Sequence, residues 1–259
     1  MNPVVLVALG AVTGALIATT GLGGGSLLTP ALLLLGLPSS VLIGTDLLIA
    51  SITKFGAGWR HHAQGTVEWK TVALLSISSV PAGYLASLIQ VRIDFLLKLL
   101  AVALVLTGLS ILERQRRSSK VAHSSQAAHS SDAVLSSASA WWTRIPLPLV
   151  GAVVGVLVGL TSVGSGAMMA LALTFILPSL RGAKFAGTDV AHGVILSAVA
   201  AFGHAQRSGV DLPVAGWVLL GALPSAWITA GLAPKMPERI ARPLLGGVLT
   251  LVGMVLLLR

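Results

Sequence analysis

The sequence predicts an all-α polytopic membrane protein made of two inverted-topology repeats. Three observations lead to this prediction: an apolar composition, a set of landmarks that occurs twice, and a glycine cluster inside an apolar stretch of each half. Of the 259 residues, 55% are hydrophobic and 10% are charged, and the mean hydropathy is +0.92. A soluble domain carries about 25% charged residues. This chain has too few charges to cover a surface in water, so lipid is its expected solvent.

Landmarks of the first half recur in the second half at an offset that stays between 141 and 144 residues. The matched motifs are residues 20–26 with 161–167, residues 44–47 with 187–190, and residues 62–64 with 204–206. Two related apolar halves, each with a glycine-interrupted segment, are typical of secondary transporters.

Each half contains about five apolar segments. The expected segments are 4–20, 26–35, 41–58, 67–89 and 93–112 in the first half, and 146–161, 167–177, 186–205, 212–232 and 240–258 in the second. A spanning helix needs about 20 apolar residues. Segments 26–35 and 167–177 are too short to cross, and each begins at a glycine cluster. We therefore expect broken or re-entrant helices at residues 21–25 and 164–166.

A polar stretch, residues 113–143, separates a first transmembrane repeat (1–112) from a second one (144–259). It is rich in serine and arginine and has no apolar periodicity. Such a composition predicts a solvated, flexible linker.

Positive charges fix the predicted orientation. With the N-terminus outside and the segments alternating, the inner loops collect Lys54, Arg60, Lys70, Arg114, Arg116, Arg117, Lys120, Arg144, Arg181, Lys184, Lys235, Arg239 and Arg242. The outer side keeps Arg92, Lys98, Arg207 and Arg259. Cytoplasmic loops carry the excess of Lys and Arg, so both termini are predicted outside and the linker inside. An odd number of segments per half then inverts the second half. Topology thus explains the net charge of +9 without a nucleic-acid partner.

The glycine clusters predict an anion site. An unwound backbone in lipid costs several kcal/mol per unsatisfied group unless it faces water or protein. The short helix that follows begins with unpaired N–H groups, which together with the helix dipole attract an anion. Close helix packing through glycine is the alternative interpretation. The expected substrate-binding residues are Thr20, Gly23, Gly24, Gly25 and Ser26 with Thr161, Ser162, Gly164, Ser165 and Gly166.

Four polar residues within apolar segments are the expected coupling or gating residues: Asp46, Lys54, Asp189 and His192. An intramembrane carboxylate costs about 2.5–3.5 kcal/mol on insertion scales and is therefore a functional candidate. A structural alternative is that each Thr-Asp pair caps the start of a helix. Lys54, about 12 Å along the helix from Asp46, either snorkels to the inner surface or offers its charge to an anion. His192 either relays protons with Asp189 or serves packing.

The sequence contains no catalytic constellation and predicts no cofactor or metal site. It has neither an HExxH motif nor a Walker loop. It has no cysteine, which excludes disulfides, thiolate metal sites and cysteine nucleophiles.

Taken together, these motifs resemble the TauE/SafE sulfite-exporter family, also called the 4-toluene sulfonate uptake permease family. The resemblance rests on residues 21–30, on residues 44–54 and onward to Trp69, and on residues 164–166 with 187–189 and 203–204. It covers nearly the whole chain outside the linker. It implies a bacterial inner-membrane carrier of small sulfur-containing or organic anions.

The predicted function is therefore a secondary transporter, an exporter, of sulfite or organosulfonates by alternating access. Its expected partners are the bilayer, the anion, and a proton or sodium ion as the coupling ion; an oligomer is left open. An anion channel with the same midplane site is the first alternative. A membrane-embedded enzyme and a scaffold without a substrate are the other two.

Overall fold

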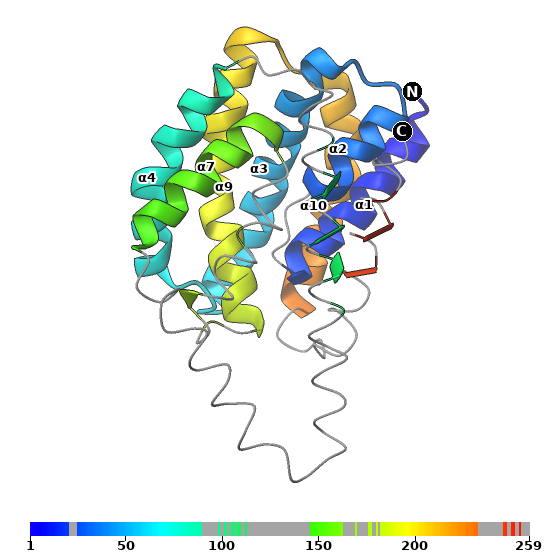
Figure 1. The fold of residues 1–259 in the computed structure, drawn as a ribbon. Coiled ribbons are helices and arrows are strands. Elements are labelled where there is room, and N and C mark those ends of the chain that lie inside the picture. The colour runs from blue at the N-terminus through cyan, green and yellow to red at the C-terminus, as the bar shows by residue number, and fades with distance from the viewer. Residues whose placement is uncertain are drawn as a thin grey trace.

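The computed structural model describes residues 1–20, 25–89, 146–162 and 182–232, together with single positions or pairs within 98–112, 169–180 and 246–254. The named helices in this part of the chain are α1 (Pro3–Thr20), α2 (Gly25–Leu34), α3 (Ser39–Ala63), α4 (Trp69–Ser87), α7 (Leu147–Thr161), α9 (Gly182–Arg207) and α10 (Leu212–Leu232) (Figure 1). No strand occurs among the described residues. The all-α prediction is confirmed for them.

The helix positions follow the apolar segments that the sequence predicts. Each of the seven helices falls on one expected segment, and α10 has the expected bounds. The helices α3 and α9 are longer than expected, at 25 and 26 residues. The linker and the expected segments 93–112, 167–177 and 240–258 lie wholly or mostly outside the described residues.

Three helices are long and apolar enough to cross a bilayer: Ser39–Ala63, Ala183–Arg207 and Leu212–Leu232. By contrast, α2 has only ten residues. At a rise of 1.5 Å per residue it extends about 15 Å, half of a hydrocarbon core about 30 Å thick. The described part of α2 is therefore shorter than a bilayer-crossing helix.

The helices pack in pairs that join the two halves. At the centre α3 packs against α9, while α1 packs on α10 and α4 packs on α7 (Figure 1). The helix α4 also contacts α9, and α10 contacts α3. In Figure 1 α3 and α9 run in opposite directions, and so do α4 and α10. Apart from the short α2, which packs mainly on α3, each of these helices thus has its main neighbour in the other half.

Small residues allow this close pairing. A Cβ added to Gly10 or Gly14 of α1 would fall on the backbone of α10, and one added to Gly155 of α7 would fall on the backbone of α4 at Ser79. Helices in lipid associate closely through such positions. Close packing through glycine therefore occurs on α1 and α7, at glycines other than those of the two predicted clusters.

Two apolar clusters flank the central helix pair. One contains Leu6, Leu28, Leu42 and Val218 and lies among α1, α2, α3 and α10. The other contains Leu47, Leu75, Val154 and Leu196 and lies among α3, α4, α7 and α9. Four ionisable residues of α3 and α9 are buried in the interior: Asp46, Lys54, Asp189 and His192.

Candidate functional site

The centre of the site is the contact between α3 and α9. These two helices carry the four residues that the sequence predicts for coupling or gating: Asp46 and Lys54 on α3, and Asp189 and His192 on α9. Their exposed fractions are 0%, 0%, 0% and 1%. Because α3 packs directly on α9, one helix pair brings all four residues into the interior.

Asp46 is held by two hydroxyl groups from different elements. Its Oδ2 accepts hydrogen bonds from Thr29 of α2 and from Ser162, which follows α7, at 2.6 Å for Ser162. The two hydroxyl oxygens lie 2.7 Å apart. All three residues are buried. The Oδ1 atom has no hydrogen-bond partner among the described residues.

Ser162 is the predicted ligand residue that the structure brings to Asp46. It ends α7 in a left-handed conformation with φ of 61°, and its N–H donates to the carbonyl of Val158. Thr29 was missed by sequence reasoning. The sequence feature that could have identified Thr29 is its hydroxyl group, three residues after Ser26 on the same short apolar helix.

Asp189 has quite different surroundings. Neither of its carboxylate oxygens has a hydrogen-bond partner among the described residues. The charge that acts on it is Lys54 of α3, which also interacts electrostatically with Asp46. Among the described residues, Asp189 thus accepts no hydrogen bond, and the buried Lys54 is the cation that acts on its charge.

Lys54 does not snorkel, so that expectation is wrong. Its side chain is fully buried and lies against Gly193 of α9, one turn after Asp189. A Cβ at Gly193 would fall on the Lys54 ammonium and its last methylene groups. The missing side chain at Gly193 gives Lys54 room, and the two carboxylates attract its ammonium inward.

The two Thr-Asp pairs do not cap the helices that carry them, which corrects the structural alternative. The helices begin at Ser39 and Gly182, about two turns before the aspartates. Each threonine instead accepts a hydrogen bond just before the start of a helix in the other half. Thr45 Oγ1 accepts from the N–H of Asp211 at 2.9 Å, just before α10. Thr188 Oγ1 accepts from the N–H of Glu68 at 3.0 Å, just before α4.

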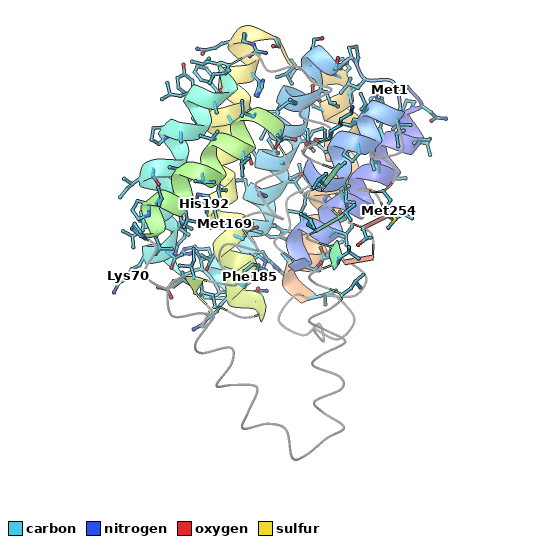
Figure 2. The ribbon with its side chains drawn as sticks, in the orientation of Figure 1. Met1, Lys70, Met169, Phe185, His192 and Met254 are labelled. Carbon is cyan, nitrogen blue, oxygen red and sulfur yellow. The ribbon has the colours of Figure 1, made fainter. Side chains whose placement is uncertain are left out.

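His192 bonds to α4 rather than to Asp189. Its Nε2 lies 2.7 Å from the Ser79 hydroxyl, on the side of the molecule formed by α4, α7 and α9 (Figure 2). No direct bond joins His192 to Asp189, since the oxygens of Asp189 have no partner in the described residues. The contact agrees with the packing role and gives no support to a direct relay.

Two further histidines, His61 and His204, correct the way in which the sequence of one half was aligned with that of the other. His61 Nε2 lies 3.0 Å from the carbonyl of Ala18, and His204 Nε2 lies 2.7 Å from the carbonyl of Gly159. Both histidines are buried and join the last turn of one helix to an adjacent helix end. The sequence had aligned His62 with His204, but His62 is exposed. The structural equivalent of His204 is His61, because both bind helix-end carbonyls.

The chain matches the family described as "Sulfite exporter TauE/SafE" over residues 6–256. It belongs to the TauE/SafE family. A curated relative, the "Probable membrane transporter protein YjnA" of Bacillus subtilis (strain 168), is 31% identical over 267 residues. The match covers 97% of this chain and 98% of that relative. No solved structure matches.

The comparisons confirm the family resemblance and the broad functional class. TauE/SafE proteins are membrane transporters and not enzymes, so the alternative of a membrane-embedded enzyme is excluded. The family implies movement of a small anion across a lipid membrane.

The structure describes the side chains of two of the ten predicted anion ligands of this TauE/SafE protein, Thr161 and Ser162. Gly23, Gly24, Gly164, Ser165 and Gly166 lie outside the described residues. Thr20 ends α1, and Gly25 and Ser26 begin α2, but their side-chain surroundings are not described. Of the remaining two, Thr161 is buried and donates to the carbonyl of Leu157 at 2.6 Å, and Ser162 bonds to Asp46.

Proposed function

We propose that this TauE/SafE protein is a secondary transporter that exports small anions, sulfite or organosulfonates, across the bacterial inner membrane by alternating access. The observation that carries this proposal is the buried polar centre where α3 meets α9. Buried ionisable residues within membrane helices mark substrate or ion pathways. Four of them lie here, on the two longest of the described helices.

Reciprocal contacts between the halves support an inverted-repeat architecture. The Thr45–Asp211 bond of one half matches the Thr188–Glu68 bond of the other. The packing of α1 on α10 matches that of α7 on α4. Opposite directions of the equivalent helices agree with a pseudo-two-fold axis in the membrane plane (Figure 1). In this arrangement the two halves would rock about the centre.

The proposed anion site lies between the two glycine-rich breaks. Its ligands would be backbone N–H groups at Gly23, Gly24 and Gly25 and at Gly164 and Gly166, with hydroxyls of Thr20, Ser26, Thr161, Ser162 and Ser165. The sequence supports this placement, because a glycine cluster precedes the short apolar helix, and the first N–H groups of a helix are unpaired and attract anions. Ser162 gives further support, since it joins one break to the buried centre at Asp46.

Asp46, Lys54, Asp189 and His192 would couple or gate transport, with a proton or a sodium ion as the coupling ion. The proposed orientation has the N-terminus outside and the linker in the cytoplasm. Met1 and Lys70 lie at opposite ends of the molecule (Figure 2). This agrees with an extracellular Met1 and a cytoplasmic, lysine-bearing start of α4.

A ligand screen tests the proposal. Purified protein is heated with sulfite, sulfate, thiosulfate, sulfoacetate, taurine or acetate, and unfolding is followed. A ligand at 100 times its Kd should stabilise the protein by about 2.7 kcal/mol. Gly24→Leu should abolish the stabilisation, because a leucine would fill the backbone cradle. Gly216→Leu is the matched control, since Gly216 is exposed with nothing within 4 Å of an added Cβ.

Proteoliposome flux separates a carrier from the alternative channel. A carrier changes shape in each cycle on the μs–ms scale, so turnover above about 10⁶ ions per second would indicate a channel. Exchange stimulated by anion on the far side would indicate a carrier. Absence of both binding and flux for every anion in the screen would overturn the proposed function.

A further inference from the structure

The two buried aspartates occupy equivalent places in the repeat, yet their partners differ. Asp46 accepts hydrogen bonds from the hydroxyls of Thr29 and Ser162. At an offset of 141 residues, the positions matching Thr29 and Ser162 are Ala170 and Gly21. Neither carries a side-chain donor. The lack of a hydroxyl partner for Asp189 among the described residues therefore agrees with this difference in sequence.

The buried cation Lys54 also occurs in only one of the two halves. Lys54 lies on α3, and its repeat mate on α9 is Ser197. The Ser197 hydroxyl is buried and has no hydrogen-bond partner among the described residues. Lys54 lies against Gly193, one turn from Asp189, and interacts with its charge. The buried lysine Lys54 thus interacts electrostatically with one carboxylate of each half, Asp46 and Asp189.

Other ionisable groups near Asp189 are few. From α3 the groups are Lys54 and Asp46. On α9 itself, His192 is bonded to Ser79 of α4 and Lys184 is exposed. From α4, Glu68 presents its backbone N–H to Thr188, and its side chain is exposed. The described helices α1, α2, α7 and α10 carry no charged side chain.

The charges of this centre oppose the entry of an anion. With Lys54 protonated and both aspartates ionised, the formal charges sum to a negative value. A buried ion is stable only when it is paired and hydrogen-bonded. Asp46 has hydroxyl donors that stabilise its charge, whereas Asp189 depends on Lys54. A proton on Asp189 would remove one of the two carboxylate charges that act on Lys54, so the ammonium group would attract a small anion more strongly.

We propose that Lys54 is the cationic ligand of the transported sulfur oxyanion or sulfonate and that ionised Asp189 competes with this anion for Lys54. This inference rests on the proposed transport function. Protonation of Asp189 releases Lys54 to the anion, and the proton comes from the water on the side to which the site is open. One proton then travels with each anion. For a monoanion no net charge crosses, so the anion leaves whenever its outward gradient exceeds the inward proton gradient.

The test measures anion affinity against pH. The probes are methanesulfonate and 4-toluenesulfonate, which stay fully ionised between pH 5.5 and 8, so only the protein titrates. Wild-type affinity should rise as pH falls, approaching tenfold per pH unit where Asp189 titrates, because one proton binds with each anion. Proteoliposomes containing a pH dye should report proton entry together with the anion.

Asp189→Asn should bind the anion with an affinity independent of pH and should exchange it without proton movement. Asp46→Asn is the matched substitution at the repeat mate, and it should keep the wild-type pH slope whatever its effect on affinity. Lys54→Met should lose binding at every pH. The double variant Lys54→Met with Asp189→Asn removes both buried charges, so it keeps the test valid if the single lysine variant fails to fold. It should fold and bind neither anion.

The inference is overturned if Asp189→Asn keeps the wild-type pH slope, if the slope is lost in Asp46→Asn instead, or if either lysine variant binds with wild-type affinity. These results require a wild-type protein that binds one of the probes. If the wild-type protein binds neither probe and no anion of the earlier screen, the proposed function itself has failed. The two failures are therefore distinguishable.

Discussion

The Ser162 hydroxyl donates to the carboxylate of Asp46 across 2.6 Å, and this bond joins the end of α7 to the middle of α3. The two residues are 116 positions apart in the chain and belong to different halves. Thr29 of α2 completes the group. One of the predicted breaks is thereby linked directly to a buried charge.

Ser162→Ala should destabilise the protein by about 1.5–3 kcal/mol, because a hydrogen bond to a buried charged group is lost. Thermal unfolding of the detergent-purified variant measures the change. Thr19→Val is the control, since the Thr19 hydroxyl bonds only to carbonyls of its own helix. Equal midpoints for Ser162→Ala and the wild type would show that the bond to Asp46 contributes nothing.

Thr45→Val and Thr188→Val should each lower stability by about 0.5–2 kcal/mol, as loss of a helix cap does. Thr45 accepts the N–H of Asp211 just before α10, and Thr188 accepts the N–H of Glu68 just before α4, so each holds the start of a helix in the other half. Unfolding midpoints of the two variants should agree. Thr229→Val, whose hydroxyl bonds within α10, should change the midpoint less. A loss at one site and none at the other would contradict the reciprocal arrangement.

Gly155→Ala should destabilise by about 1–3 kcal/mol, the typical cost of overpacking. Its new Cβ would fall on the backbone of Ser79, where α7 crosses α4. Gly216→Ala has open space around it and should be neutral or stabilising by up to about 1 kcal/mol through helix propensity. Folded yield and unfolding midpoint both report the difference. Similar behaviour of the two variants would argue against the close crossing.

Gln64→Cys and Gln206→Cys should be labelled from opposite sides of the membrane. The two glutamines are matched in the repeat and are both exposed. An impermeant maleimide applied to intact cells should label Gln206→Cys, and Gln64→Cys should react only after permeabilisation. The chain contains no cysteine, so there is no background. Labelling of both variants from one side would reject the inverted repeat.

Much of the fold could be predicted, and less of the site. The predicted apolar segments 4–20, 146–161 and 212–232 agree closely with the bounds of α1, α7 and α10. They could be predicted because the length of an apolar stretch is a local property of the chain. The aspartates were recognised as candidates because a charge within an apolar segment is costly. Their partners could not be deduced, since Thr29 and Ser162 lie 133 positions apart.

Some sequence inferences failed for the same reason. Helix capping by the Thr-Asp pairs was inferred from local motifs, but α3 and α9 begin about two turns earlier and the threonines hold other helices. The match of His62 with His204 followed letter identity, while His61 has the equivalent contact. Local similarity does not determine which side chain faces the neighbouring helix.

The sequence by itself determined the family, the helical segments, the repeat and the presence of two intramembrane carboxylates, because composition and spacing are carried by the chain without reference to contacts. Only the tertiary structure decided that Asp46 accepts hydrogen bonds from two hydroxyls and that the buried Lys54 lies against Gly193, one turn from Asp189. The path of Lys54 depends on the space that Gly193 leaves on a helix of the other half. Such a space exists only once α3 and α9 have packed together.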